Sequence, residues 1–465
     1  MLMNLLTGQI AILISQLMVV SFVLYLIDQK QRPTSMLAWV FAILLVPYIA
    51  VPFFFLFGIR KRHKKWEKPL FRPQNIQQKP IQKAKPLSDL LSNLGVPEPT
   101  SNNAVSLYTD GIEAYNALFH AIKNAHCSIY LATYVFQKDT LTESLLDLLT
   151  QKAEQGIEVK VLIDALGSLK VYTHQRYFKA LRQAGGEVHF FMPIFQMPFR
   201  NYINYRNHRK IYLIDQAIVF SGGMNLGNEY LGPRPCSKRW NDILFRIDGE
   251  AVCHFYNIFI SDWRYATHES IQPMRHVTNY CPTIPPSEQT TLQIVPSGPD
   301  IPNDALYDSL LYAMYTSKQR IWIVTPYFVP SESLMEALAI MAQKGIDIKI
   351  ITPENTNHKL VGIARRSFMR QLEKNGVDIV FCRQMIHAKA ILFDDDAVML
   401  GSVNLDSRSL FLNYEIAAYA YDKNVITPIA DWMNTLLDHA KYGLSEPTKG
   451  QLFRESIVKC IVPLL

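Results

Sequence analysis

Apolar residues follow two different patterns along this chain. Residues 1–27 and 33–59 contain no charged side chain, so each run exceeds the roughly 20 apolar residues that cross the hydrocarbon core of a bilayer. From about residue 105 onward, short apolar runs alternate instead with stretches whose apolar residues recur at helical spacing. The pattern predicts two transmembrane helices, at about 5–27 and 36–58, followed by a body of alternating helices and buried strands.

The basic residues near the second apolar run predict its orientation. The connection between the two runs carries only Lys30 and Arg32 as basic residues, whereas a dense basic cluster follows the second run. Because an excess of basic residues normally stays in the cytoplasm, we expect both chain termini and the body on the cytoplasmic side. A cleaved signal peptide is the alternative for the first run, which lacks the basic region and the small-residue cleavage site of such peptides. The basic cluster consists of Arg60, Lys61, Arg62, Lys64, Lys65 and Lys68.

Composition then divides the rest of the chain. Six prolines fall between residues 69 and 103, a density typical of a linker. We therefore assign residues 1–68 to a membrane anchor and 69–104 to a linker with a short helix at 88–94. The body repeats one order of elements, so we assign 105–290 to a first α/β domain and 291–465 to a second. The first copy has expected helices at 114–125, 142–154 and 174–184 and strands at 128–136, 157–163 and 188–192, and the second has helices at 305–316, 334–343 and 360–375 and strands at 320–325, 346–351 and 377–382.

One polar motif is written twice in this body. In both copies one residue separates His from Lys, four residues separate Lys from Asp, and Asn lies seventeen positions after His. A chance match does not keep four positions in step over so long a separation, so we expect a shared functional role. The first copy consists of His208, Lys210, Asp215 and Asn225, and the second of His387, Lys389, Asp394 and Asn404.

The spacing predicts which motif side chains point the same way. Successive side chains of a strand alternate between its faces, so each histidine shares a face with its lysine and both can point into one cleft. Asp215 and Asp394 lie five positions after the lysines, on the opposite face. We group these aspartates with the catalytic motif and interpret them as residues that support the fold.

The repeated motif resembles the active-site motif of the phospholipase D superfamily, in which two copies form one site. The flanking residues 221–230 and 401–409, together with the two apolar N-terminal runs, resemble the bacterial cardiolipin synthases over nearly the whole chain. The resemblance implies an α/β fold with a duplicated phospholipase D-like domain, in which two mixed β-sheets with flanking helices form one shared active site. It also implies a multi-pass protein of the bacterial inner membrane.

The residue types of the motif suit the cleavage of a phosphodiester. Such a reaction needs cations around the phosphoryl oxygens, hydrogen-bond donors, a nucleophile and a proton donor. We expect Lys210 and Lys389 to neutralise the phosphoryl oxygens, and Asn225, Asn404 and Ser402 to bind the substrate phosphate.

The two histidines would supply the nucleophile and the proton donor that the reaction also needs. One imidazole must be neutral and attack phosphorus, while the other must be protonated and release the leaving alcohol. The resemblance implies a phosphohistidine intermediate. One sequence does not show which histidine attacks; by analogy with the superfamily we assign His208 as the nucleophile and His387 as the acid and then the base.

Carboxylates that orient the histidines are expected at the starts of two matching strands. Asp242 and Glu415 occupy the same place in their apolar runs and are our candidates. For the first histidine, Glu229 remains an alternative to Asp242, because it lies close to Asn225 in the chain.

Charge and cysteine usage narrow the class of protein. The formal net charge of +7 suits an anionic partner without choosing between nucleic acid and lipid headgroups. The six cysteines form no CxxC pair, which argues against a zinc site and a disulfide framework and fits a reducing compartment. We expect no metal and no cofactor. The cysteines are Cys127, Cys236, Cys253, Cys281, Cys382 and Cys460.

These expectations combine into one function with two rivals. The resemblance implies that two molecules of phosphatidylglycerol, as donor and acceptor, yield cardiolipin and glycerol, with no nucleic acid as partner. A membrane-bound phospholipase D that hydrolyses phospholipids and a membrane-tethered nuclease are the alternatives. Whether phosphatidylethanolamine also serves as a substrate, and the oligomeric state, stay open. Residues 190–199 are unusually apolar for a loop and either line an acyl-chain entry or form a buried connection.

Overall fold

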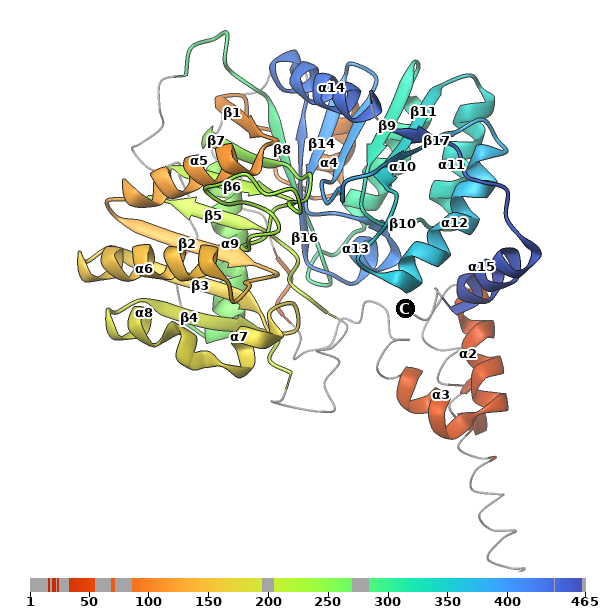
Figure 1. Ribbon diagram of the computed structural model, residues 1–465, viewed down its shortest axis with the longest axis horizontal. Helices are drawn as coiled ribbons and strands as arrows, with labels where there is room; N and C mark the ends of the chain where they lie inside the picture. The colour runs from red at the N-terminus through yellow and green to blue at the C-terminus, as the bar shows by residue number, and fades with distance from the viewer. Residues whose placement is uncertain are drawn as a thin grey trace, which may run out of the picture.

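The computed structural model describes residues 33–54, 68–71, 86–194, 205–269, 284–438 and 440–461, together with positions 16, 19–21, 23 and 24. Most of the predicted first transmembrane segment, the basic residues at 60–65 and the end of the apolar stretch at 195–199 lie outside the described residues. The body consists of two α/β halves that lie side by side, the first in yellow and green and the second in cyan and blue (Figure 1).

The first half is built on a seven-stranded mixed sheet in the order β1-β7-β6-β5-β2-β3-β4. Strands β2, β3 and β4 run parallel, as the expected alternation of strands and helices requires, and the other neighbours pair antiparallel. The strands are β1 (Asn103–Tyr108), β2 (Ser128–Thr133), β3 (Glu158–Asp164), β4 (Glu187–Phe191), β5 (Ile211–Ile214), β6 (Ile218–Gly222) and β7 (Leu244–Gly249).

The helices of the first half largely follow the predicted spacing. The helix expected at 174–184 is instead a 3₁₀ turn followed by a short α-helix. Residues 190 and 191 end β4, and they are buried together with Met192, which favours a buried connection for this part of the apolar stretch. The helices are α5 (Gly111–Lys123), α6 (Thr140–Glu154), α7 (Leu169–Thr173), η2 (Gln175–Phe178), α8 (Lys179–Gln183) and α9 (Val252–Thr267).

The second half repeats this arrangement. Its eight-stranded sheet has the order β17-β12-β11-β9-β13-β14-β16-β8, which matches the first sheet read from β8 and adds β17 at the far edge. The strands are β8 (Leu292–Ser297), β9 (Arg320–Val324), β11 (Asp347–Pro353), β12 (Asp378–Cys382), β13 (Ala390–Phe393), β14 (Ala397–Gly401), β16 (Glu415–Ala420) and β17 (Lys441–Tyr442), with β10 (Phe328–Val329) and β15 (Leu405–Asp406) pairing separately. The helices are α10 (Ala305–Thr316), α11 (Glu332–Gln343), α12 (Lys359–Glu373), α13 (Ser407–Phe411), α14 (Lys423–Leu437) and α15 (Lys449–Ile461).

One apolar core joins the two sheets. Alternate residues of β5, Ile211 and Leu213, point into a core that both sheets share with α9 and α14, while Tyr212 and Ile214 point into the outer core of the first half. The strand β13 divides its side chains between the shared core and the outer core of the second half in the same way. The period of two therefore explains why both motif strands are buried on both faces.

The second predicted membrane span differs from the expectation. A single helix was expected at about 36–58, but the described part forms α2 (Pro33–Leu45) and α3 (Pro47–Phe53), which pack together through Trp39, Ile43, Ala50 and Phe54. Proline disfavours helical geometry at the preceding residue, and the backbone there, at Val46, leaves the helical region. Within the part of the chain that the structure describes, no helix is both long and apolar enough to cross a membrane.

The expected linker is partly ordered. The helix α4 (Pro86–Asn93) contacts α10, and its Leu87 and Leu91 belong to the outer core of the second half. Phe71 is also buried, and its N–H donates to the carbonyl of Asp300 at 2.9 Å. The apolar side chains of this stretch find a place in the core, so the described residues at both ends of the predicted linker belong to the body.

The motif aspartates tie each motif hairpin to the neighbouring strand. Asp215 and Asp394 both have left-handed backbone geometry, with φ of 53° and 52°, at the turn that follows β5 or β13. Each carboxylate accepts three backbone N–H groups at the start of β2 or β9, which is the end of the motif strand away from the histidine. The donors to Asp215 are His126, Cys127 and Ser128, and those to Asp394 are Lys318, Gln319 and Arg320.

The substitution Asp394→Ala tests this structural role. It leaves three partly buried N–H groups without their acceptor, so we expect the free energy of unfolding to fall by about 2–3 kcal/mol. Denaturant titration of the purified protein measures the change. Asp395→Ala is the matched control, because Asp395 is more than half exposed and, among the described residues, its one ion pair is with Arg320 at the surface. Equal destabilisation by both substitutions would contradict the assigned role.

Candidate active site

Two short backbone pairings join the halves at the motif histidines. The segment before His208 pairs with Tyr414 of the second half, and the segment before His387 pairs with Asn241 of the first half. The N–H of His208 donates to the carbonyl of Tyr414 at 2.9 Å, and the N–H of His387 donates to that of Asn241 at 2.7 Å. The backbone of each histidine is therefore hydrogen-bonded to the opposite half of the molecule, a few residues before β5 or β13 begins.

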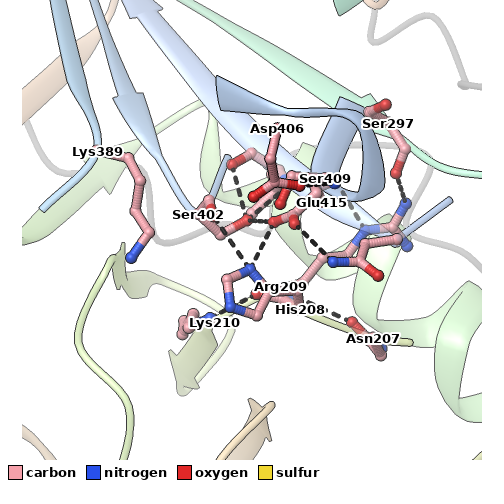
Figure 2. Close-up of polar contacts among 12 residues, drawn as sticks. Asn207, His208, Arg209, Lys210, Ser297, Lys389, Ser402, Asp406, Ser409 and Glu415 are labelled. Atoms are coloured by element: carbon pink, nitrogen blue, oxygen red, sulfur yellow. Dashed lines mark hydrogen bonds and ion pairs between the residues drawn. The ribbon is translucent and has the colours of Figure 1, made fainter. Parts of the chain in front are cut away.

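The carboxylates that hold the imidazoles come from the opposite half in both cases. Nδ1 of His208 lies 2.9 Å from Oε2 of Glu415, and Nδ1 of His387 lies 2.7 Å from Oδ2 of Asp242. Figure 2 shows the His208 side of this arrangement, with Glu415 directly above the ring. We infer that each Nδ1 donates its proton to its carboxylate, which leaves Nε2 with a lone pair.

This crosswise pairing corrects one sequence-based expectation. Asp242 and Glu229 were the alternatives for orienting His208, but Glu415 takes that place and Asp242 holds His387. Glu229 instead accepts a hydrogen bond from Gln137 at the surface. The reason is that the residue next to each carboxylate pairs with the backbone of the opposite motif, so the carboxylate meets the histidine of the other half.

The structure also corrects the role of Ser402. Its hydroxyl donates to Oε2 of Glu415, the same oxygen that faces His208, and accepts the N–H of Ile416 at 3.1 Å (Figure 2). The hydroxyl is therefore engaged with the orienting carboxylate, so its proton is not free to bind the substrate phosphate.

Gly223 is the residue of the first half that corresponds to Ser402 of the second half, and the structure explains why a glycine stands there. A Cβ atom added there would lie 2.0 Å from Oδ1 of Asp242. The shorter aspartate reaches His387 only because no side chain stands beside it. The two half-sites thus use different pairs, a glutamate with a serine on one side and an aspartate with a glycine on the other.

The two lysines lie buried beside the imidazoles. Nζ of Lys210 donates to the carbonyl of His208 at 2.8 Å, and Nζ of Lys389 lies 2.9 Å from Nδ1 of His387. Burial lowers the pKa of Lys389 to about 8, and burial together with repulsion from Lys389 holds the pKa of Lys210 well below its usual range. An anion between them would favour the charged form of both.

Burial also shifts the pKa values of the two imidazoles and of the carboxylates that face them. It lowers the pKa of His208 to about 4 and holds that of His387 well below its usual range, with Lys389 adding repulsion at the second ring. Burial raises the pKa of Asp242 to about 6. Burial opposes ionisation of Glu415 too, but His208 outweighs it and holds the pKa of that carboxyl below its usual value. Around neutral pH the site therefore contains neutral imidazoles and an ionised Glu415.

Both histidines line one cavity of about 380 Å³. Asn225 and Asn404, the predicted phosphate-binding amides, line the same cavity, and Oδ1 of Asn404 has no hydrogen-bond partner among the described residues. Arg408 also lines it and was missed by sequence reasoning, although it lies only four positions after Asn404. Three apolar residues of α12, Leu360, Val361 and Ala364, also line this cavity.

A buried ion network fixes the segment that carries His208. Asp262 of α9 accepts from Nη1 of Arg209 at 2.7 Å and from Nδ2 of Asn207 at 3.0 Å, the two neighbours of His208. Lys68 joins from the other side, 2.5 Å from Asp262 and 2.6 Å from Asp300. Lys68 belongs to the basic cluster from which the sequence predicts the orientation, but its side chain is buried and neutralises these carboxylates.

One further group has atoms close enough to hold a metal ion. Ligand atoms of Glu187, His189 and Glu269 lie within 4.8 Å of one another. However, Lys160 pairs with Glu187, and the indole N–H of Trp263 donates to Glu269 at 2.9 Å, so both carboxylates already have partners. We assign no metal to this group.

The duplicated fold and the histidine pair that its halves share define an enzyme of the phospholipase D superfamily. A family model described as "Cardiolipin synthase, PLD-like domain" matches residues 118–263 and 310–437, which is more than half of the chain and includes both motif histidines. The chain belongs to this family of cardiolipin synthases.

Known relatives agree with this assignment along the full chain. The major cardiolipin synthase ClsA of Bacillus subtilis strain 168 is 32% identical, with 98% of this chain and 99% of the relative covered. A cardiolipin synthase of Listeria monocytogenes serotype 4a is also 32% identical, over 94% of this chain and 95% of that protein. The crystal structure of a phosphatidylserine synthase from Haemophilus influenzae Rd KW20 has the same fold, with a TM-score of 0.60, 18% identity and coverage of 82% of this chain and 100% of that one.

The substitution Gly223→Ala tests the space beside Asp242. The added methyl group must displace the carboxylate that holds His387, so we expect kcat to fall by about 100-fold, as for other displacements near 1 Å. Ser402→Ala is the matched control in the other half-site, because it removes a hydroxyl without crowding Glu415, and we expect less than about a tenfold loss. Circular dichroism checks that both variants fold. Wild-type activity in Gly223→Ala would show that the close approach does not matter.

Proposed function

We propose that the protein transfers a phosphatidyl group from one phosphatidylglycerol to the primary hydroxyl of a second, which yields cardiolipin and glycerol. The observation that carries this proposal is the pair of buried imidazoles, each held at Nδ1 by a carboxylate of the opposite half, at one cavity. Relatives named cardiolipin synthase, matched over nearly their whole length, support the choice of substrate.

In the first step His208 attacks phosphorus. The Glu415 carboxylate holds Nδ1–H, so the lone pair of Nε2 is available for attack, and a pKa near 4 keeps the ring neutral at physiological pH. The new N–P bond replaces the bond between phosphorus and the glycerol oxygen. His387 gives a proton to that oxygen, and glycerol leaves.

In the second step the phosphohistidine is resolved. The hydroxyl of a second phosphatidylglycerol attacks phosphorus, His387 accepts the proton of that hydroxyl, and the N–P bond breaks to release cardiolipin and free His208. The anionic phosphodiester favours the protonated form of His387, because it adds negative charge beside a ring that burial keeps neutral. Asp242 holds the same ring in place through both proton transfers.

The cations and amides stabilise the charge that develops on phosphorus. Lys210 and Lys389 neutralise the phosphoryl oxygens, and Asn225 and Asn404 donate hydrogen bonds to them; a preorganised donor of this kind contributes about 3–4 kcal/mol. Asp215 and Asp394 act only through the fold. The apolar wall that α12 contributes suits acyl glycerol better than a nucleotide, which favours a lipid substrate over nucleic acid.

We further infer that residues 1–68 anchor the enzyme in the bacterial inner membrane as a multi-pass segment, with the catalytic body in the cytoplasm. Two long charge-free runs and the basic residues that follow the second run support this placement. Many apolar side chains of α2 and α3 are exposed, among them Phe41 and Leu45. The domain boundaries at 105–290 and 291–465 remain predictions.

Product analysis tests the proposed reaction. Purified full-length protein, mixed with phosphatidylglycerol that carries ³²P in its phosphodiester, should form labelled cardiolipin and release glycerol, and His208→Ala should abolish both. Rapid quenching should trap an acid-labile ³²P label on the wild-type protein and none on His208→Ala. Phosphatidic acid as the main product would favour the hydrolase, and a label that persists in His208→Ala would reassign the nucleophile.

The pH dependence of kcat/KM tests the electrostatics of the free enzyme. Lys389 must be charged to stabilise the phosphoryl oxygens, and its lowered pKa means that the charge is lost as the pH rises through about 8. We expect kcat/KM to fall at least about tenfold per pH unit above that value, because Lys210 must be charged as well and its pKa is also lowered. Because His208 stays neutral down to about pH 4, its own titration should give no acid limb near pH 6.5. A profile that keeps rising to pH 10 would contradict this assignment.

A further inference from the structure

The C-terminal helix α15 presents an apolar face to solvent. Phe453 is 68% exposed, and Leu452 and Ile457 are each 45% exposed. Phe453 and Ile457 are four positions apart, so they share one face of the helix. The opposite side of α15 is fixed to the body, because it packs against α12 and its buried Glu455 pairs with Arg370 at 3.1 Å.

A basic pocket of about 410 Å³ lies beside this apolar face, between α12 and α15. The side chain of Arg365 is almost fully buried there, and its Nε has no hydrogen-bond partner among the described residues. Glu455 is already paired with Arg370 and Glu354 lies 3.9 Å from Lys441, so the cations of the pocket are in excess. The charged residues of the lining are Lys359, Arg365, Arg366 and Arg454 against Glu354 and Glu455.

The first turns of α12 separate this pocket from the active site. Leu360, Val361 and Ala364 line the catalytic cavity, while Lys359 and Arg366 of the same turns line the basic pocket. A ligand in the pocket would therefore lie about one helix diameter, roughly 10 Å, from the catalytic cavity.

The location of α15 relates this surface to the N-terminal region. In Figure 1 α15 lies at the lower right, on the same side of the molecule as α2 and α3. Those two helices also expose large apolar side chains, which include Phe41, Leu45 and Tyr48. Exposed apolar side chains next to an excess of cations are the features of a helix that lies in the interface of an anionic membrane.

We propose that α15 and the basic pocket form a surface that docks on an anionic phospholipid bilayer. Leu452, Phe453 and Ile457 enter the interface, and the pocket holds the phosphodiester of one anionic lipid through Arg366 and Arg454. The docking rests on the proposed function only in placing the enzyme at a lipid surface. Docking would hold α12, whose apolar residues line the catalytic cavity, close to the membrane that supplies the substrate.

Quenching by spin-labelled lipid tests this docking in the full-length protein. Ile457→Cys is labelled with a fluorophore, and the protein is reconstituted in nanodiscs that contain phosphatidylglycerol and doxyl-labelled phosphatidylcholine. Cys127, Cys236, Cys281 and Cys460 are first replaced by serine. Burial raises the pKa of Cys253 and Cys382 to about 11, so these thiols should remain unlabelled.

Ile340→Cys is the matched control. Ile340 is 46% exposed on α11, against 45% for Ile457 on α15, and α11 lies farther from α2 and α3 in Figure 1. We expect the probe at position 457 to lose most of its fluorescence, and the probe at position 340 to keep it. Discs of phosphatidylcholine alone should quench position 457 much less.

The charge of the pocket is tested in the same assay. Arg454→Gln should raise the fraction of phosphatidylglycerol needed for half-maximal quenching by about fivefold, the effect of one cation near a membrane surface, whereas Arg454→Lys should leave it unchanged. Inorganic phosphate added to phosphatidylcholine discs should not restore quenching, because the proposed ligand is a membrane lipid.

Four results would overturn the docking surface. The first is equal quenching at positions 340 and 457, and the second is a probe at position 457 that no lipid quenches. The third is quenching at position 457 that changes neither with the fraction of phosphatidylglycerol nor with Arg454→Gln. The fourth is quenching in phosphatidylcholine discs that inorganic phosphate alone restores. The readout needs no turnover. An inactive protein whose probe is quenched as expected would refute the proposed reaction and keep the docking surface, and an active protein without quenching would do the reverse.

Discussion

The active site depends on a reciprocal exchange of hydrogen bonds between the two halves of the chain. The backbone of each motif pairs with the opposite half just before a strand, so His208 meets Glu415 and His387 meets Asp242. Neither half can orient its own histidine. The catalytic groups therefore come together only when both halves have folded and docked, and the apolar core that the two sheets share supplies the free energy that holds them together.

The two copies are similar but not identical, and they differ at the carboxylates that orient the two histidines. Glu415 is stabilised as an anion by His208 and by the hydroxyl of Ser402, whereas Asp242 has no such hydroxyl and burial raises its pKa. Two histidines that began as copies thus have different electrostatic surroundings. A reaction that needs one imidazole as nucleophile and the other as proton donor and acceptor requires such a difference.

Buried ion pairs made by Lys68 connect the N-terminal region to the segment that carries His208. Lys68, the last residue of the basic cluster, pairs with Asp262, which also binds Asn207 and Arg209 on either side of His208. Two cations and two carboxylates neutralise one another in this buried network, so removal of one member would leave an unpaired charge in the core. Lys68, which ends the predicted anchor, thereby helps to support the segment that carries His208, the proposed nucleophile.

The sequence by itself determined the duplication, the α/β class, the two histidine–lysine motifs and the family, because strand alternation and a repeated spacing are local properties of the chain. Spacing along one strand does not show which residue of the other sheet lies opposite. Only the tertiary structure decided that Glu415 orients His208, that Ser402 donates to Glu415 and that Lys68 is buried. Each of these depends on contacts between segments far apart in the chain, which no local pattern records.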